Sequence, residues 1–180
     1  MNKIILTGTQ GTGKTTTLNL LFENKKIKKK YVKITEVFRS LAKDYNMPLN
    51  KKSTTTTQTI GFNKYLEKFL LTPKFISDRG LIDVMAYTLY LFNKKRIDHL
   101  TYNYQIELFK HYHQQELFDE VFYFPIQFPI EKDGVRDEDE IYRKEIDSII
   151  RSLLINYKIP HIIVKDTFEK SRDLILKKIL

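Results

Sequence analysis

A glycine-rich stretch near the start of the chain restricts the possible folds more than any other feature. Residues 8–15, GTQGTGKT, match the pattern G-x-x-x-x-G-K-[ST] in full. The continuously apolar residues 4–6 before it are typical of a parallel strand that is buried on both faces. Apolar residues then recur at helical spacing over residues 15–22. The stretch therefore predicts a strand, a phosphate-binding loop and a helix in direct succession.

The residue types in this loop suit the binding of a polyphosphate. Glycines allow positive φ and bring backbone N–H groups close to phosphate oxygens, where a Cβ would interfere. The helix adds N–H groups and the positive end of its dipole, Lys14 adds a cation, and the Thr15 hydroxyl suits Mg²⁺. No third glycine follows at the spacing of a dinucleotide-binding fingerprint, which excludes that motif. The predicted nucleotide-binding residues are Gly8, Thr9, Gln10, Gly11, Thr12, Gly13, Lys14, Thr15 and Thr16.

Length and composition indicate one globular domain over residues 1–180. A hydrophobic content of 42% and a charged content of 29% are ordinary for a soluble protein. The chain contains no cysteine, which excludes disulfides and thiolate metal sites. No stretch approaches the roughly 20 apolar residues of a membrane helix, and the first strand begins too early to leave room for a signal peptide. We therefore expect a cytoplasmic protein without a membrane partner, of unknown oligomeric state.

The net charge of +9 favours anionic partners. Much of the charge lies between the first predicted helix and the next strand, on Lys25, Lys26, Lys28, Lys29, Lys30 and Lys33. A solvated, lysine-biased loop is one interpretation, and a surface that contacts a polynucleotide is the other. No aromatic-glycine RNA-binding signature accompanies the cluster, so the loop is the preferred interpretation.

Short apolar or β-branched runs alternate with helical patterns along the rest of the chain. Strands are expected near residues 4–6, 31–35, 75–77, 121–124 and 162–164, and residues 50–57 have the composition of a polar loop. This alternation predicts a three-layer α/β/α fold with five parallel strands. Because such sheets bind ligands at the carboxyl ends of their strands, the residues after the first three strands should face one crevice.

Charged residues follow the second and third predicted strands. Asp78 is expected to hold Mg²⁺ together with Thr15, and Arg79 to clamp a phosphate. Glu36 is the candidate base for an acceptor hydroxyl, with Arg39 one turn further on holding phosphate or the Glu36 carboxylate. Structural alternatives remain: helix capping for Asp78, a helix-start position for Glu36 and an ordinary ion pair for Arg79.

Two further arginines lie in an otherwise acidic stretch, residues 131–147. Arg136 and Arg143 can close over a transferring phosphate and exclude water, or form ordinary ion pairs with nearby carboxylates. The predicted catalytic residues are Lys14, Glu36, Arg79, Arg136 and Arg143.

At these residues the chain resembles the P-loop nucleoside and nucleotide kinases, and in particular the kinase domains similar to ribosylnicotinamide kinase and the phage-type nucleotide kinases. The resemblance covers nearly the whole chain and depends on residues 8–15, 36–39, 78–79 with 83–87, and 134–136 with Arg143. It implies a P-loop NTPase fold, ATP as donor, a lid over residues 130–144, and acceptor binding by Glu36 and Arg79. It also implies that Gln58 contacts a nucleobase. One departure is Gly80, where many nucleoside kinases have serine.

Three functions are consistent with these features. The leading hypothesis is an ATP- and Mg²⁺-dependent kinase of a nucleoside or nucleoside monophosphate. A kinase of polynucleotides or of modified bases in nucleic acid is the second, favoured by the lysine cluster. A non-kinase NTP-hydrolysing switch or binding module is the third. The acceptor itself depends on the shape of the pocket across loops 46–57 and 93–104, which the sequence does not determine.

Overall fold

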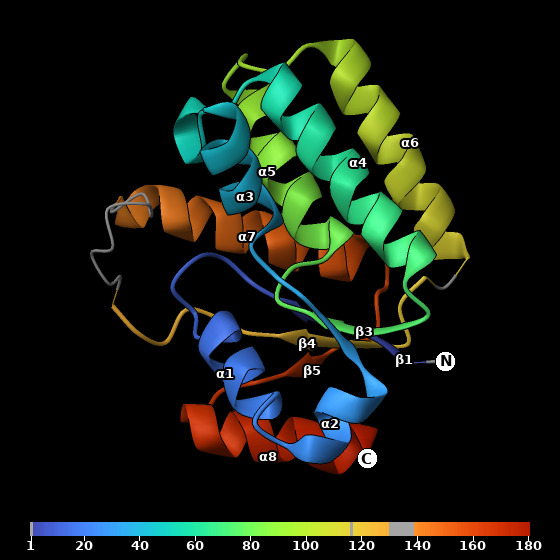
Figure 1. Ribbon diagram of the computed structural model, residues 1–180. Helices are drawn as coiled ribbons and strands as arrows, with labels where there is room; N and C mark the ends of the chain where they lie inside the picture. Colours follow the sequence, from blue (N-terminus) through green and yellow to red (C-terminus); the bar gives the residue numbers. More distant parts are fainter. Residues whose placement is uncertain (1, 116, 130–138) are drawn as a thin grey trace.

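The computed structural model describes residues 2–115, 117–129 and 139–180 (Figure 1). Its centre is a five-stranded sheet in which every neighbouring pair is parallel, in the order β2-β3-β1-β4-β5. The strands are β1 (Asn2–Thr7), β2 (Val32–Ile34), β3 (Lys74–Ser77), β4 (Glu120–Tyr123) and β5 (Ile162–Ile163). The predicted five-stranded parallel sheet is therefore confirmed.

Helices cover both faces of the sheet. One layer contains α1 (Lys14–Leu21), α2 (Lys25–Lys30) and α8 (Phe168–Ile179), drawn below the sheet in Figure 1. The other layer contains α3 (Val37–Tyr45), α4 (Thr55–Leu71), α5 (Leu81–Asn93), α6 (His99–Gln114) and α7 (Glu140–Asn156). A short 3₁₀ turn, η1 (Asn50–Lys52), precedes α4. The three-layer α/β/α prediction is confirmed.

The central strand β1 shows why the sheet needs two helical layers. Ile5 packs into the core beneath α3 to α7, whereas Ile4 and Leu6 pack into a separate core against α1 and α8. All three side chains have no exposed surface. Because successive side chains of a strand point to opposite faces, the continuous apolar run of β1 requires cover on both sides.

The lysine cluster corrects one sequence-based interpretation. Residues 25–30 form helix α2 and not the expected loop. Asn24 caps this helix by accepting a hydrogen bond from the Lys26 N–H, and Ile27 is fully buried. One apolar anchor and one cap therefore hold a helix whose other residues are lysines. Because α2 leads into the start of β2, it lies at the amino ends of the strands.

The loop expected over residues 50–57 is also partly helical. Helix α4 begins at Thr55, with the Thr54 hydroxyl accepting a hydrogen bond from the Thr57 N–H. Threonine is a favoured N-cap residue because its hydroxyl accepts a first-turn N–H, which explains why this threonine-rich segment starts a helix. Within the described part of the chain, no helix is long and apolar enough to cross a membrane.

Candidate functional site

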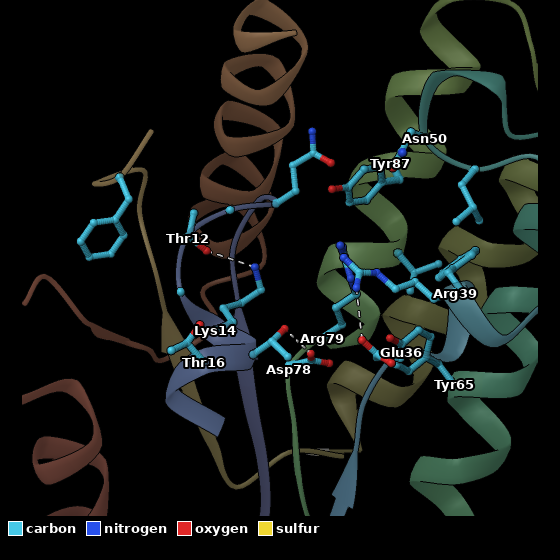
Figure 2. Close-up of a pocket in the computed structure, with 18 of the residues that line it drawn as sticks. Thr12, Lys14, Thr16, Glu36, Arg39, Asn50, Tyr65, Asp78, Arg79 and Tyr87 are labelled. Atoms are coloured by element: carbon cyan, nitrogen blue, oxygen red, sulfur yellow. Dashed lines mark hydrogen bonds and ion pairs between the residues drawn. The ribbon is translucent and has the colours of Figure 1, made fainter. Parts of the chain in front are cut away.

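A pocket opens at the carboxyl ends of β1, β2 and β3, where the topology of a parallel sheet places ligands. It brings together most of the predicted site residues (Figure 2): Gln10, Gly11, Thr12, Gly13, Lys14, Thr15, Thr16, Glu36, Arg39, Gln58, Asp78 and Arg79. Lys14 and Thr12 lie on one side of the hollow in Figure 2, and Glu36, Arg39 and Tyr65 lie on the other. Gly8 and Thr9 are not among the residues that line the pocket. Arg136 falls in 130–138, outside the described residues.

The loop between β1 and α1 has a backbone that only glycine accommodates. Gly8 has φ +146°, and a Cβ on it would lie 2.3 Å from the Phe124 carbonyl oxygen. Gly13 has φ +86°, and a Cβ there would lie 2.5 Å from the Phe168 ring. Both glycines therefore combine a positive φ with a close approach, which L-residues with side chains cannot reproduce without strain.

The start of α1 is suited to an anion. Its N-cap is Gly13, which has no side chain to accept the first-turn N–H groups, and no acidic residue lies in the first turn. Lys14 lies across the loop, with its ammonium donating to the Gly8 and Thr9 carbonyls at 2.6 Å each and to the Thr12 hydroxyl at 3.1 Å. First-turn N–H groups, the helix dipole and a cation thus converge on one spot.

The Arg143 side chain is bonded to the glycine-rich loop. It lies in α7, with its side chain 1% exposed. Its Nε donates to the Gln10 carbonyl and its Nη2 to the Gly11 carbonyl, both at 3.0 Å, while Nη1 pairs with Glu140 at 3.1 Å. The guanidinium therefore holds the loop from behind. Residues 140–144 of the expected lid are helical and residues 130–138 lie outside the described part of the chain, so the lid and a catalytic role for Arg143 stay predictions.

Asp83 is a residue that the sequence did not single out as part of the site. Its carboxylate is fully buried and accepts the Gly8 N–H at 3.0 Å and the Gly80 N–H at 2.7 Å. It therefore ties the glycine-rich loop to the end of β3. Burial raises the pKa of Asp83 above its usual range, and nearby Lys14 and Arg79 oppose that rise. Its sequence signals are its place in residues 83–87, which carry part of the family resemblance, and its position as an acidic residue in the first turn of a helix.

Thr15, Thr35 and Asp78 form a cluster of oxygen atoms beside the loop. The Thr15 and Thr35 hydroxyls both donate to Asp78 Oδ2 at 2.7 Å. Asp78 Oδ1 is buried and has no hydrogen-bond partner among the described residues. A buried carboxylate oxygen without a partner is costly unless a cation or its water shell is bound there. The carboxylate and hydroxyl donors thus fit Mg²⁺, as predicted for Thr15 and Asp78, and Thr35 is an addition from the structure.

Two arginines accompany the carboxylates. Arg39 Nη1 lies 3.2 Å from Glu36 Oε1, which is the second of the two roles expected for Arg39. Both side chains are about half exposed, and Glu36 has φ +58°, a rare conformation for a non-glycine residue. The Arg79 guanidinium lies over the Tyr87 ring, 5.2 Å from its centroid. Charged groups thus border the half of the pocket that lies opposite the loop.

The deep wall of that half is formed by α4 and α5. Gln58 is 2% exposed and lines the pocket. Tyr65 lines it as well, with a buried hydroxyl that has no hydrogen-bond partner among the described residues. The departure at Gly80 has a steric reason, because a Cβ there would lie 2.7 Å from Ile5 Cγ2. A serine there would therefore require the Ile5 side chain to shift.

An aromatic pair lines the other end of the pocket, beside the loop. The Phe128 and Phe168 rings are 5.0 Å apart between centroids, with an interplanar angle of 52°, and both approach Gly13. Neither phenylalanine was singled out from the sequence, because they lie in segments 40 residues apart. The pocket thus has an aromatic end, a phosphate-binding centre and a charged end.

Comparisons with known proteins agree with this geometry. A family model described as an AAA domain matches residues 3–171. Deoxyadenosine kinase from M. mycoides with bound dATP aligns with a TM-score of 0.67 and 22% identity, over 99% of this chain and 98% of that chain. NadR in complex with NR aligns with a TM-score of 0.72 and 15% identity, over 98% of this chain and 51% of NadR. A search of curated proteins found no match. The chain therefore belongs to the AAA domain family, and its fold is that of the P-loop kinases which its sequence resembles.

Proposed function

We propose that this protein transfers the γ-phosphoryl group of ATP to a nucleoside or a nucleoside monophosphate. The observation that carries the proposal is one continuous pocket, lined on one side by the phosphate-binding loop and on the other by Glu36, Arg39 and Arg79. Phosphoryl transfer depends mainly on positioning and on neutralising charge, and this pocket offers both. The fold similarity to deoxyadenosine kinase and NadR supports the same reaction class.

In this mechanism, the loop N–H groups and Lys14 bind the triphosphate, and the aromatic pair Phe128 and Phe168 packs against the donor base. Thr15 and Asp78 would hold a Mg²⁺ ion, which neutralises charge on the phosphate oxygens when it is bound. Lys14 leaves the loop carbonyls to contact the β- and γ-phosphates.

The charged end of the pocket handles the acceptor. Glu36 accepts the proton of an acceptor hydroxyl as the hydroxyl oxygen bonds to the γ-phosphorus and the bond from that phosphorus to the β–γ bridging oxygen breaks, so that ADP leaves. Arg79, held over Tyr87, neutralises charge on the transferred group. A monophosphate acceptor is already anionic and would depend more on Arg39 and Arg79 than on Glu36.

The lysine helix gives the polynucleotide alternative little support. Helix α2 lies at the amino ends of the strands, whereas the pocket lies at their carboxyl ends. A polynucleotide bound to α2 would therefore have to pass around the sheet to reach Lys14.

A transfer screen tests the proposal. The protein is incubated with γ-labelled ATP and Mg²⁺, with nucleosides, nucleoside monophosphates or oligonucleotides as acceptors. We expect label on a nucleoside or monophosphate, and loss of that label in Lys14→Met. Label on oligonucleotides alone would favour the second function, and ATP hydrolysis with no labelled acceptor would favour the switch.

A further inference from the structure

The lysines of α2 form a charged surface at the end of the sheet opposite the pocket. Because α2 leads into β2, this surface lies at the amino ends of the strands, whereas the pocket lies at their carboxyl ends. In Figure 1, α2 lies beside the C-terminal end of α8. These two helices contribute seven exposed lysines, which we call the basic face: Lys25, Lys26, Lys28, Lys29, Lys30, Lys177 and Lys178.

Contacts between the two helices bring the lysines of the basic face together. The Tyr31 hydroxyl and the Lys30 ammonium both donate to the Ile179 carbonyl oxygen, at 3.4 and 3.2 Å. Ile27 has no exposed surface and packs into the same core as Ile175 and Ile179. The basic face is therefore built from two helices that are docked on each other.

The buried Ile27 fixes the direction in which the lysines of α2 point. Successive residues of an α-helix are rotated by about 100°, so Lys25 and Lys29 lie opposite Ile27 and point to solvent. Lys26 and Lys28 lie on the two flanks of the helix. The outer half of α2 therefore presents cations only.

Few carboxylates neutralise this charge within the described part of the chain. The one ion pair of the basic face among the described residues joins Lys178 to Glu120, at 3.5 Å. Lysines three and four positions apart in α2 repel one another, which destabilises a helix. The Asn24 cap and the buried Ile27 hold α2 in spite of that repulsion. The fold thus maintains a concentrated positive charge that an external polyanion would neutralise.

The chemistry of the basic face restricts which polyanion it fits. Helix α2 has no exposed apolar side chain, whereas a helix that binds in a membrane surface buries an apolar face there. Single-stranded nucleic acid is normally held by aromatic rings on which its bases stack. The aromatic residues that flank α2 in the sequence, Phe22 and Tyr31, both pack into the core. Contact with a regular phosphate backbone requires cations only, so a duplex fits best.

We propose that the basic face binds the phosphate backbone of double-stranded nucleic acid, independently of its sequence. A DNA duplex carries one negative charge per about 1.7 Å of its axis, so α2, about 9 Å long, faces several phosphates at once. The duplex is not the phosphoryl acceptor, because Lys14 lies at the other end of the strands. The inference therefore goes beyond the proposed function and does not depend on it.

Fluorescence anisotropy with short labelled DNA and RNA duplexes tests the inference. For two unrelated sequences we expect dissociation constants of about 1–100 μM at 0.15 M salt that agree within about threefold. If about four to six phosphates are neutralised, the affinity for DNA should fall about 100- to 2,000-fold between 50 and 200 mM salt. Binding of either duplex supports the proposal, and the tighter of the two identifies the natural source of the backbone.

Two double variants with the same change of charge separate the basic face from general basicity. Lys25→Glu with Lys29→Glu should weaken duplex binding at least about tenfold at 50 mM salt, since four units of charge change at the face. The matched control is Lys64→Glu with Lys144→Glu, which reverses exposed lysines of α4 and α7 in the other helical layer. The control should weaken binding less than about threefold. Both variants should keep the wild-type affinity for ATP, because none of the four lysines lines the pocket.

A second variant of the face covers the case in which charge reversal unfolds α2. Lys177→Gln with Lys178→Gln leaves the α2 sequence intact and should weaken duplex binding about threefold or more. Circular dichroism shows whether each variant is folded.

Competition with ATP separates the basic face from the phosphate-binding loop. Saturating ATP and Mg²⁺ at constant ionic strength should leave duplex binding unchanged. Loss of binding on adding ATP, an equal loss in the face and control variants, or no binding of either duplex at 50 mM salt would overturn the proposal. Binding of phosphatidylcholine–phosphatidylserine vesicles in place of the duplexes would overturn it as well and assign the face to a membrane. Since none of these measurements involves phosphoryl transfer, a failure of the proposed function is distinguishable from a failure of this one.

Discussion

Asp83→Asn is the substitution that most directly tests how this protein organises its phosphate-binding loop. Each carboxylate oxygen of Asp83 accepts one backbone N–H, from Gly80 at 2.7 Å and from Gly8 at 3.0 Å. Asparagine keeps one oxygen and replaces the other with an NH₂ group. The oxygen should stay with Gly80, which lies in the same helix start, so the Gly8 N–H would face another donor.

The magnitude follows from that lost bond. A hydrogen bond to a charged group contributes about 1.5–3 kcal/mol net, and each 1.4 kcal/mol corresponds to a factor of ten in affinity. Replacing a buried charge with a neutral amide offsets part of the loss. We therefore expect ATP to bind about 10- to 100-fold more weakly to Asp83→Asn than to the wild type.

The assay is calorimetric titration with ATP and Mg²⁺, with circular dichroism to show that the variant is folded. Asp147→Asn is the matched control, because Asp147 is also a buried carboxylate, 7% exposed, and accepts a hydrogen bond from the Tyr123 hydroxyl on α7's side of the core. The control should lose stability but keep its ATP affinity. A folded Asp83→Asn that binds ATP within twofold of the wild type would refute the reasoning.

Four more predictions concern the same site. Lys14→Met should abolish phosphoryl transfer and weaken ATP binding at least tenfold in titration, because it removes the cation of the loop. Glu36→Gln should lower kcat for a nucleoside acceptor by about 100-fold or more while the ATP dissociation constant stays within twofold; an unchanged kcat would exclude Glu36 as the base. Gly13→Ala should lower stability by about 1–3 kcal/mol in urea unfolding, because alanine at φ +86° is strained and its Cβ meets Phe168. Burial raises the folded-state pKa of Asp83, so its contribution to stability is fully present below the unfolded pKa of about 4 and is lost as pH rises through the higher folded pKa. The free energy of unfolding of the wild type, relative to that of Asp83→Asn, should therefore fall as pH rises through that window. A difference that does not change with pH would contradict this.

Local chemistry made the centre of the site predictable. The backbone of residues 8–15 requires glycine at specific positions, and the strand before and the helix after it have distinct hydrophobic patterns. The position of Asp78 was predictable as well, because the carboxyl ends of parallel strands meet at one edge of the sheet. Its carboxylate accepts a hydrogen bond from Thr15, 63 positions away in the sequence. The alternation of strands and helices was enough to predict the layers.

Helix α2 and Arg143 show what the sequence pattern alone did not reveal. Six residues with five lysines carry no amphipathic signal, and the burial of Ile27 against the core together with the Asn24 cap explains the helix. The resemblance placed Arg143 at the end of a lid, among charged residues near the pocket. In the fold its guanidinium is buried on loop carbonyls, which supply hydrogen bonds that compensate for the lost water.

The sequence by itself determined the β1–loop–α1 unit, the parallel sheet and the edge at which a nucleotide binds, because each depends on residue types close together in the chain. Tertiary structure alone decided which distant groups hold that unit in place. Asp83 reaches Gly8 across 75 positions, and Arg143 reaches Gln10 across 133. Such partners leave no periodic pattern, because a buried polar group is defined by what surrounds it in space and not by its neighbours along the chain.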